Sequence, residues 1–402
     1  GACKDSPGFS HNMEWVTAAG LAFIDTAVAT SKPFFLYFNP TVPHSPSVSE
    51  ALFEISIRKT PGGDLDSDPA SGMPPRTGTN GTSVKERAEA SVDGTDANGK
   101  KKEAAYAAVW IDDAMGALYA KLKALNVLND TLILFVMDHG ASGKSTLYET
   151  GGRIAMFARY PNHAGNFFAA GASHDFLVSN MDIAPTLVQL ANIPSTDGSV
   201  GPSDAKRIDG TSLLVSNRAA ERALFLSLGK DRAVVTNTGK MIVKNVEGYG
   251  TSTVRGCTAS TTGNSGHLYP GNGDATQVYD LSADPTEQTN LASASAGSSP
   301  AALQAKLKTL LDCHVENTKI GSTVFEDTCQ PTATIPPSAV PAPSSSPAST
   351  IPPSAVPAPS SSPASTIGPG FTENDGNTAH EAVALVMVVS WASAIALACS
   401  AL

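Results

Sequence analysis

The chain is short of positive charge, and this shortage argues against one class of partners. Its 402 residues contain 27 lysines and arginines against 37 aspartates and glutamates, which gives a net charge of −10. The one clustered basic run is the short stretch GKKK at 99–102. Nucleic-acid-binding proteins concentrate lysine and arginine on one face. The sequence therefore predicts no nucleic-acid partner.

Charge is absent altogether from the last 21 residues, 382–402, AVALVMVVSWASAIALACSAL. A run of this length and apolarity can span a bilayer. No lysine or arginine follows Lys319, so the basic flank expected of a membrane helix is missing. Small residues and a polar spacer precede the apolar run, which favours a GPI-anchor signal, with a membrane helix as the alternative. We therefore expect membrane attachment through a C-terminal lipid anchor or helix.

The chain also lacks an initiator methionine and a signal peptide at its start. We interpret this as the loss of a leader or of a larger N-terminal segment. Once Cys399 in the tail is set aside, the remaining cysteines are Cys3, Cys257, Cys313 and Cys329. Four cysteines allow three pairings, and the sequence does not choose among them. Acceptor sequons for N-glycosylation begin at Asn80 and Asn129. These features predict a glycoprotein of the secretory pathway that is extracellular or on the cell surface.

A repeated, proline-rich segment divides the chain. Residues 334–349, TIPPSAVPAPSSSPAS, recur identically at 350–365. Proline at this density prevents helices and sheets, and the serines and threonines keep the segment hydrated. We predict a disordered stalk over 330–367, followed at 368–402 by the anchor signal or membrane tail.

The pattern before the stalk predicts an α/β fold. Continuous apolar runs at 34–38 and 131–137 are typical of strands buried on both faces, and 153–160 is a third candidate strand. Apolar residues between 107 and 125 are spaced to form one helical face, and 181–192 form another predicted helix. Residues 58–102 are predicted to be a surface excursion. The expected architecture is a mostly parallel sheet sandwiched by helices, followed from about Ala223 by a small antiparallel-sheet C-terminal domain.

Polar side chains follow two of the predicted strands. Open α/β sheets bind ligands where their strands end. Asp138 and His139 come directly after the strand at 131–137, and His44 comes shortly after the strand at 34–38. Asp138 and His139 offer metal ligands, and Lys144 offers a cation for an anion. Together they predict a site for a metal and a tetrahedral oxyanion ester, with a simple polar loop as the alternative.

Five segments occur in an order that resembles the sulfatase family, within the alkaline phosphatase superfamily. They are PFFLYFNPTVPHSP, YAAVWIDDAMGALYAKLKALNVLNDTLILFVMDHG, GKSTLYETGGRIAMFARYP, LVSNMDIAPTLVQLANI and VYDLSADPTEQTNLA, spread over about 260 residues. The resemblance implies that residues 1–217 are the C-terminal half of a sulfatase-like catalytic domain. It implies a small α+β C-terminal domain at 218–329.

The resemblance also implies roles for individual residues. Asp138 and His139 match metal ligands, whereas His44 and Lys144 match catalytic residues that contact the sulfate ester. The implied cofactor is one divalent cation, Ca²⁺, with Mg²⁺ as the alternative. The implied substrate is a sulfated small molecule or polysaccharide. Glu149 and Arg153 match positions that we interpret as structural supports.

The chain departs from the family at the nucleophile. Sulfatases carry C-x-P-x-R, or its serine form, whose first residue becomes formylglycine, and no such segment occurs here. We therefore expect formylglycine only in a missing N-terminal part, and we expect this chain alone to be inactive. Two alternatives stay open: a phosphodiesterase or phosphatase of the same superfamily, and a non-catalytic surface glycoprotein that binds sulfated glycans.

Overall fold

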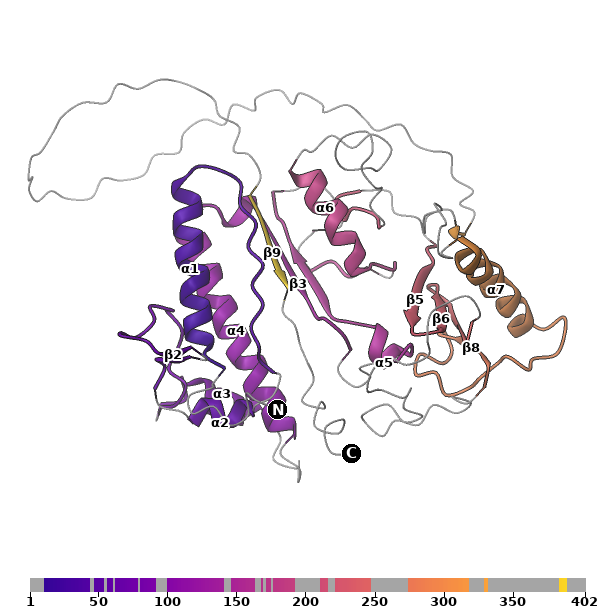
Figure 1. The fold of residues 1–402 in the computed structure, drawn as a ribbon, viewed down its shortest axis with the longest axis horizontal. Helices are drawn as coiled ribbons and strands as arrows, with labels where there is room; N and C mark the ends of the chain where they lie inside the picture. Colours follow the sequence, from indigo (N-terminus) through magenta and orange to yellow (C-terminus); the bar gives the residue numbers. More distant parts are fainter. Residues whose placement is uncertain are drawn as a thin grey trace, which may run out of the picture. The chain divides into compact units, whose positions relative to one another are not determined.

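The fold is taken from a computed structural model of the chain (Figure 1). The structure describes residues 11–43, 47–53, 56–60, 62–78, 80–91, 100–140, 146–162, 168, 171–174, 176–191, 210–215, 221–246, 274–317, 329–331 and 383–388. All of these belong to one compact unit.

Four helices build the first part of the fold: α1 (Met13–Ala29), α2 (Val48–Phe53), α3 (Val84–Ser91) and α4 (Lys100–Ala124). Helix α1 begins where the side chain of Asn12 accepts a hydrogen bond from the backbone N–H of Trp15 at 2.8 Å, which satisfies a donor that the helix itself leaves unpaired. Along α4, the predicted apolar face is confirmed, because Ala107, Ala114, Leu118 and Leu122 are fully buried. This face packs against α1, and the two helices share one hydrophobic cluster.

The prediction of a surface excursion over 58–102 is wrong in part. The segment contains a two-stranded hairpin, β1 (Lys59–Thr60) with β2 (Gly63–Asp64), and helix α3. Val84 and Ala88 on α3 are fully buried. Arg76 is also buried and forms a two-pronged ion pair with Glu14 of α1 at 3.0 and 2.7 Å. The segment looked exposed because its inward-facing side chains include polar ones that find partners inside the protein.

A three-stranded sheet lies beside these helices, in the order β4 (Met156–Arg159), β3 (Thr131–Val136), β9 (Val383–Val388). The strands predicted at 131–137 and 153–160 are thus confirmed. β3 runs antiparallel to β4 and parallel to β9, so the described part of this sheet is mixed rather than mostly parallel. The α/β class itself is confirmed.

Residues 383–388 lie in the apolar tail for which we expected an anchor signal or a membrane helix. The structure has them as strand β9, in keeping with their valine-rich sequence. Among the helices of the described residues, none combines the length and apolarity that a membrane crossing requires.

The two faces of β3 meet different helices, because successive side chains of a strand point to opposite sides. Leu132, Leu134 and Val136 pack in a cluster with helix α6 (Ile183–Leu190). Ile133 instead joins the cluster of α1 and α4. The prediction of a strand covered by helices on both faces is confirmed for β3.

The run at 34–38 is not a strand, which corrects the prediction. Phe34 and Phe38 are buried on the α1–α4 cluster, whereas Phe35 and Tyr37 are 51% and 52% exposed. No strand pairing involves these residues in the described part of the chain. Continuous apolar sequence predicted burial on two faces, but the segment packs on one face only.

A second, four-stranded antiparallel sheet confirms the pattern predicted from Ala223 onward. Its order is β5 (Leu224–Leu228), β6 (Asp231–Val235), β7 (Gly239–Val243) and β8 (Thr276–Asp280). Helix α7 (Ser299–Asn317) packs on it through Leu307, Leu310 and Leu311. A disulfide joins Cys313 near the end of α7 to Cys329, which is one of the pairings that the sequence left open.

Candidate active site at the end of strand β3

Asp138 and His139 lie two and three residues beyond the end of β3, as expected. The backbone N–H of His139 donates to Oδ1 of Asp138 at 2.9 Å. Nδ1 of His139 lies 2.9 Å from the carbonyl oxygen of Gly140. A carbonyl only accepts, so Nδ1 carries the proton, and in the neutral ring Nε2 then presents a lone pair.

Nε2 of His139 is a buried polar atom that has no hydrogen-bond partner among the described residues. It lies 3.5 Å from Oδ2 of Asp138. The backbone carbonyl of Gly140 fixes the tautomer of the imidazole, so that Nε2 is free to act as a metal ligand. Together with the neighbouring carboxylate oxygen of Asp138, Nε2 forms a pair of ligands that fits a divalent cation. The oxygen suits Ca²⁺ or Mg²⁺, whereas the nitrogen is a softer ligand than either ion prefers.

The turn that carries this pair is held by backbone contacts. The N–H of Met137 donates to Ala155 at 3.1 Å, and the N–H of Gly140 donates to Gly151 at 2.9 Å. Only glycine fits at 140, because a Cβ there would lie 2.0 Å from the carbonyl oxygen of Thr150. Gly151 belongs to the short helix α5 (Glu149–Gly152), so α5 lies directly against the turn that carries Asp138 and His139.

The remaining predicted site residues are not brought to this point by the described structure. His44 and Lys144 lie outside the described residues. Among the described residues, no group of three or more histidine, cysteine, aspartate or glutamate side chains could hold a metal ion. The described part of the site therefore contains one pair of candidate metal ligands, Asp138 and His139.

The predicted glycosylation sites, Asn80 and Asn129, are both exposed. Oδ1 of Asn129 accepts a hydrogen bond from Arg159 at 2.8 Å. Exposure is compatible with glycosylation of either asparagine.

The adjacent acidic residues Asp112 and Asp113 of α4 have different surroundings. Asp113 is buried and pairs with Arg87, whereas Asp112 is exposed. Burial raises the pKa of Asp113, and the Arg87 guanidinium offsets this only in part. The two carboxylates therefore have no common target.

Sequence reasoning missed a buried ionic cluster next to α5. Lys240 on β7 is fully buried and pairs with Glu149 at 2.6 Å and with Glu287 at 2.9 Å. Burial raises the pKa of Glu287 more than Lys240 lowers it. Lys240 is the second residue of β7, within a mostly apolar and buried strand, so the sequence could have indicated a buried lysine but not its partners.

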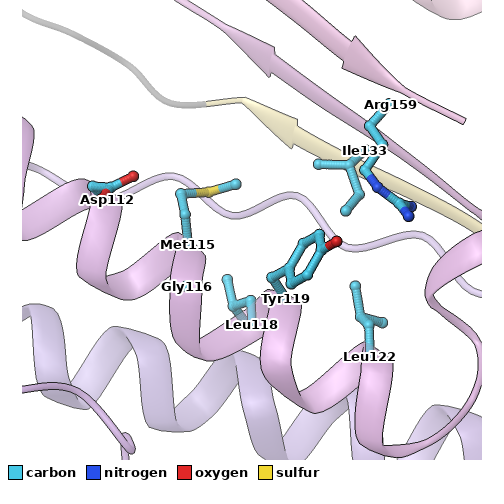
Figure 2. A pocket seen from close by; sticks show the side chains of 8 residues that line it. All are labelled: Asp112, Met115, Gly116, Leu118, Tyr119, Leu122, Ile133 and Arg159. Carbon is cyan, nitrogen blue, oxygen red and sulfur yellow. The ribbon is translucent and has the colours of Figure 1, made fainter. Parts of the chain in front are cut away.

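A separate pocket of about 270 Å³ lies between α4 and the β3–β4 pair. In Figure 2, Tyr119 and Leu122 of α4 face Ile133 and Arg159 of the strands. Arg159 lies over the Tyr119 ring at 5.4 Å and donates to the carbonyl of Leu128. Ile133 and Arg159 pair near the beginning of β3, so this pocket is not part of the site at the strand's other end.

Comparison with known proteins finds one family that matches part of the chain. Residues 2–193 match the family described as Sulfatase. The chain is 29% identical to human arylsulfatase A over 218 residues, which is 48% of this chain and 40% of that protein. It is 31% identical to choline-sulfatase of Rhizobium meliloti over 209 residues, 50% of this chain and 35% of that protein. This chain thus spans about two fifths or less of the length of these two relatives.

A solved structure, Ps i-CgsB in complex with k-i-k-neocarrahexaose, matches 76% of this chain and 54% of its own, with 19% identity and a TM-score of 0.47. The sequence comparisons thus confirm the resemblance to the sulfatase family for residues 2–193.

Proposed function

We propose that this chain forms the metal-binding part of a sulfuric ester hydrolase site. The observation that carries the proposal is the turn after β3, where Nε2 of His139 is buried without a hydrogen-bond partner in the described structure and lies beside Oδ2 of Asp138. The match of residues 2–193 to the sulfatase family supports a metal-binding role for that pair.

In this proposal, Asp138 and His139 hold one divalent cation, Ca²⁺ or alternatively Mg²⁺. When bound, the cation neutralises the nonbridging oxygens of the sulfate ester. His44 and Lys144 match the family's sulfate-contacting positions and stabilise charge on the sulfate and the leaving oxygen. The substrate class is an aryl or carbohydrate sulfate.

The nucleophile is the remaining element of the proposal. None of the 402 residues belongs to a C-x-P-x-R or S-x-P-x-R segment, so we propose that formylglycine is supplied by residues outside the given sequence. The 402-residue chain by itself is then inactive. We further propose a secretory, GPI-anchored surface location, supported by the apolar tail, the stalk and the sequons.

The test compares the 402-residue chain with the full product of its gene, each purified and assayed on an aryl sulfate and on the matching aryl phosphate ester. We expect the full product to hydrolyse the sulfate, to lose activity on chelation and to lose it in Lys144→Ala. Turnover of the phosphate ester alone would instead indicate a phosphatase. Sulfated-glycan binding by a full product without turnover of either ester would indicate a binding protein.

A further inference from the structure

A buried ionic cluster links the C-terminal sheet to the candidate site. Lys240 on β7 lies between the carboxylates of Glu149, the first residue of α5, and Glu287, which follows β8. Lys240 and Glu287 are fully buried, and the Glu149 side chain is 18% exposed. Two carboxylates against one ammonium leave a formal net negative charge in the interior.

A buried ionic cluster of this kind contributes little net free energy to folding. Removing charges from water costs several kcal/mol per ion, and well-packed apolar residues of similar volume are often at least as stabilising. Glu287 adds a conformational cost, because its φ of 58° is in the left-handed region that a residue with a side chain disfavours. A strained backbone with a buried charge indicates that the surrounding structure requires this geometry.

The cluster fixes the beginning of α5 through several contacts. Oε2 of Glu287 accepts a hydrogen bond from the backbone N–H of Glu149 at 2.7 Å. The hydroxyl of Tyr148 donates to Oε1 of Gln277 on β8 at 2.6 Å. The side chain of Glu149 reaches Lys240 itself. Two consecutive residues are thereby held against β7, β8 and the loop after β8.

The end of α5 is in turn joined to the turn that carries the candidate ligands. The carbonyl oxygen of Gly151 accepts from the N–H of Gly140 at 2.9 Å. The carbonyl oxygen of Gly140 accepts from Nδ1 of His139. Helix α5 has only four residues and is attached at both ends, so it has little freedom to move by itself. A shift at Glu149 therefore reaches the His139 ring through α5, the hydrogen bond between Gly151 and Gly140, and the hydrogen bond between Gly140 and His139.

We propose that Lys240 is a positioning residue for the Asp138–His139 pair, acting through Glu149 and α5. This inference rests on the proposed function insofar as it assigns the pair a metal. The C-terminal sheet then has a specific role in the site, because it holds α5, and α5 orients the imidazole whose Nε2 faces Asp138.

The test uses the whole 402-residue chain and three variants. Lys240→Met keeps the length of the side chain and leaves the carboxylates of Glu149 and Glu287 without their shared cation. In Lys240→Met/Glu287→Gln, one of those charges is removed, and the amide oxygen still accepts from the N–H of Glu149. Arg76→Met is the matched control, because it breaks another buried ion pair, with Glu14, in the helical part of the protein.

The first measurement is amide hydrogen exchange at Met137 and Gly140, whose N–H groups bond to Ala155 and Gly151. We expect exchange at least about tenfold faster in Lys240→Met, with amides in the middle of α4 unchanged. Arg76→Met should leave Met137 and Gly140 unchanged, and the double variant should restore most of their protection. Unchanged exchange in Lys240→Met, or equal acceleration in Arg76→Met, would overturn the inference.

The second measurement is Ca²⁺ affinity by calorimetry. We expect Lys240→Met to weaken binding at least about tenfold, and Arg76→Met to leave it unchanged. Equal affinity in Lys240→Met and wild type would also overturn the inference. A wild-type chain that binds no Ca²⁺ or Mg²⁺ would refute the metal site of the proposed function, and the exchange data would still decide whether Lys240 positions the turn.

Discussion

Replacing Arg222 with methionine tests the reasoning about buried charge. Asp182, at the start of α6, is fully buried. The Arg222 guanidinium donates to both of its oxygens, at 2.6 and 2.8 Å. The N–H groups of Thr211 and Ser179 donate to them at 2.7 and 3.0 Å. Arg222→Met removes the cation and leaves the carboxylate buried with its backbone donors.

The expected cost at pH 7 is about 3 kcal/mol, the lower end of the range for breaking a buried ion pair, because two backbone donors remain. A loss of this size lowers the melting temperature by about 5–10 °C. Lys306→Met is the matched control. It breaks the exposed pair of Lys306 with Glu221, which is worth less than about 1 kcal/mol.

The effect of Arg222→Met should also depend on pH. Burial alone raises the pKa of Asp182, but Arg222 and the backbone donors outweigh it and hold the pKa below its usual value. In the wild type this contribution to stability is present above the carboxyl's unfolded pKa and is lost as pH falls through the lowered folded pKa. Without Arg222, burial dominates and the carboxyl takes up a proton more readily. The difference in melting temperature should therefore be largest at pH 7 and should shrink as the pH falls toward the lowered folded pKa of Asp182. A constant difference across that range would refute the reasoning.

Other perturbations have expected outcomes that thermal unfolding and binding assays check. Leu134→Ala on β3 should cost about 2–5 kcal/mol, because the side chain is fully buried; a loss below about 1 kcal/mol would contradict that packing. Gly140→Ala should weaken Ca²⁺ binding, because its Cβ would lie 2.0 Å from the Thr150 carbonyl oxygen; unchanged affinity would show that the turn does not depend on this approach. Reducing Cys313–Cys329, which closes a loop of sequence separation 16, should cost about 3 kcal/mol, and an unchanged melting temperature would contradict this.

The spacing of apolar residues predicted helix α4, and a continuous apolar run predicted strand β3; both lie where the sequence placed them. The antiparallel strands β6, β7 and β8 lie within the region predicted to be an antiparallel sheet from about Ala223 onward. The prediction of a strand at 34–38 failed because an apolar composition does not show whether a segment is covered on one face or on both. Phe35 and Tyr37 are exposed although the sequence predicted burial on both faces.

The candidate site was predictable only in part. Asp138 and His139 could be placed because a strand end is visible as a change from apolar to polar residues. The Lys240 cluster could not, because its three members are up to 138 residues apart (Glu149 to Glu287) and none belongs to a local pattern. Only the fold shows that a lysine within β7 meets a glutamate that follows β8.

The central proposal is that Asp138 and His139, at the end of β3, bind a divalent cation. Measuring Ca²⁺ binding to the 402-residue chain tests this most directly. Calorimetry would compare the wild type with Asp138→Asn, His139→Ala and the exposed control Asp112→Asn. We predict that the wild type binds one cation, that Asp138→Asn and His139→Ala each weaken this binding at least about tenfold, and that Asp112→Asn leaves it unchanged. Equal binding in all four proteins, or no binding in the wild type, would contradict it.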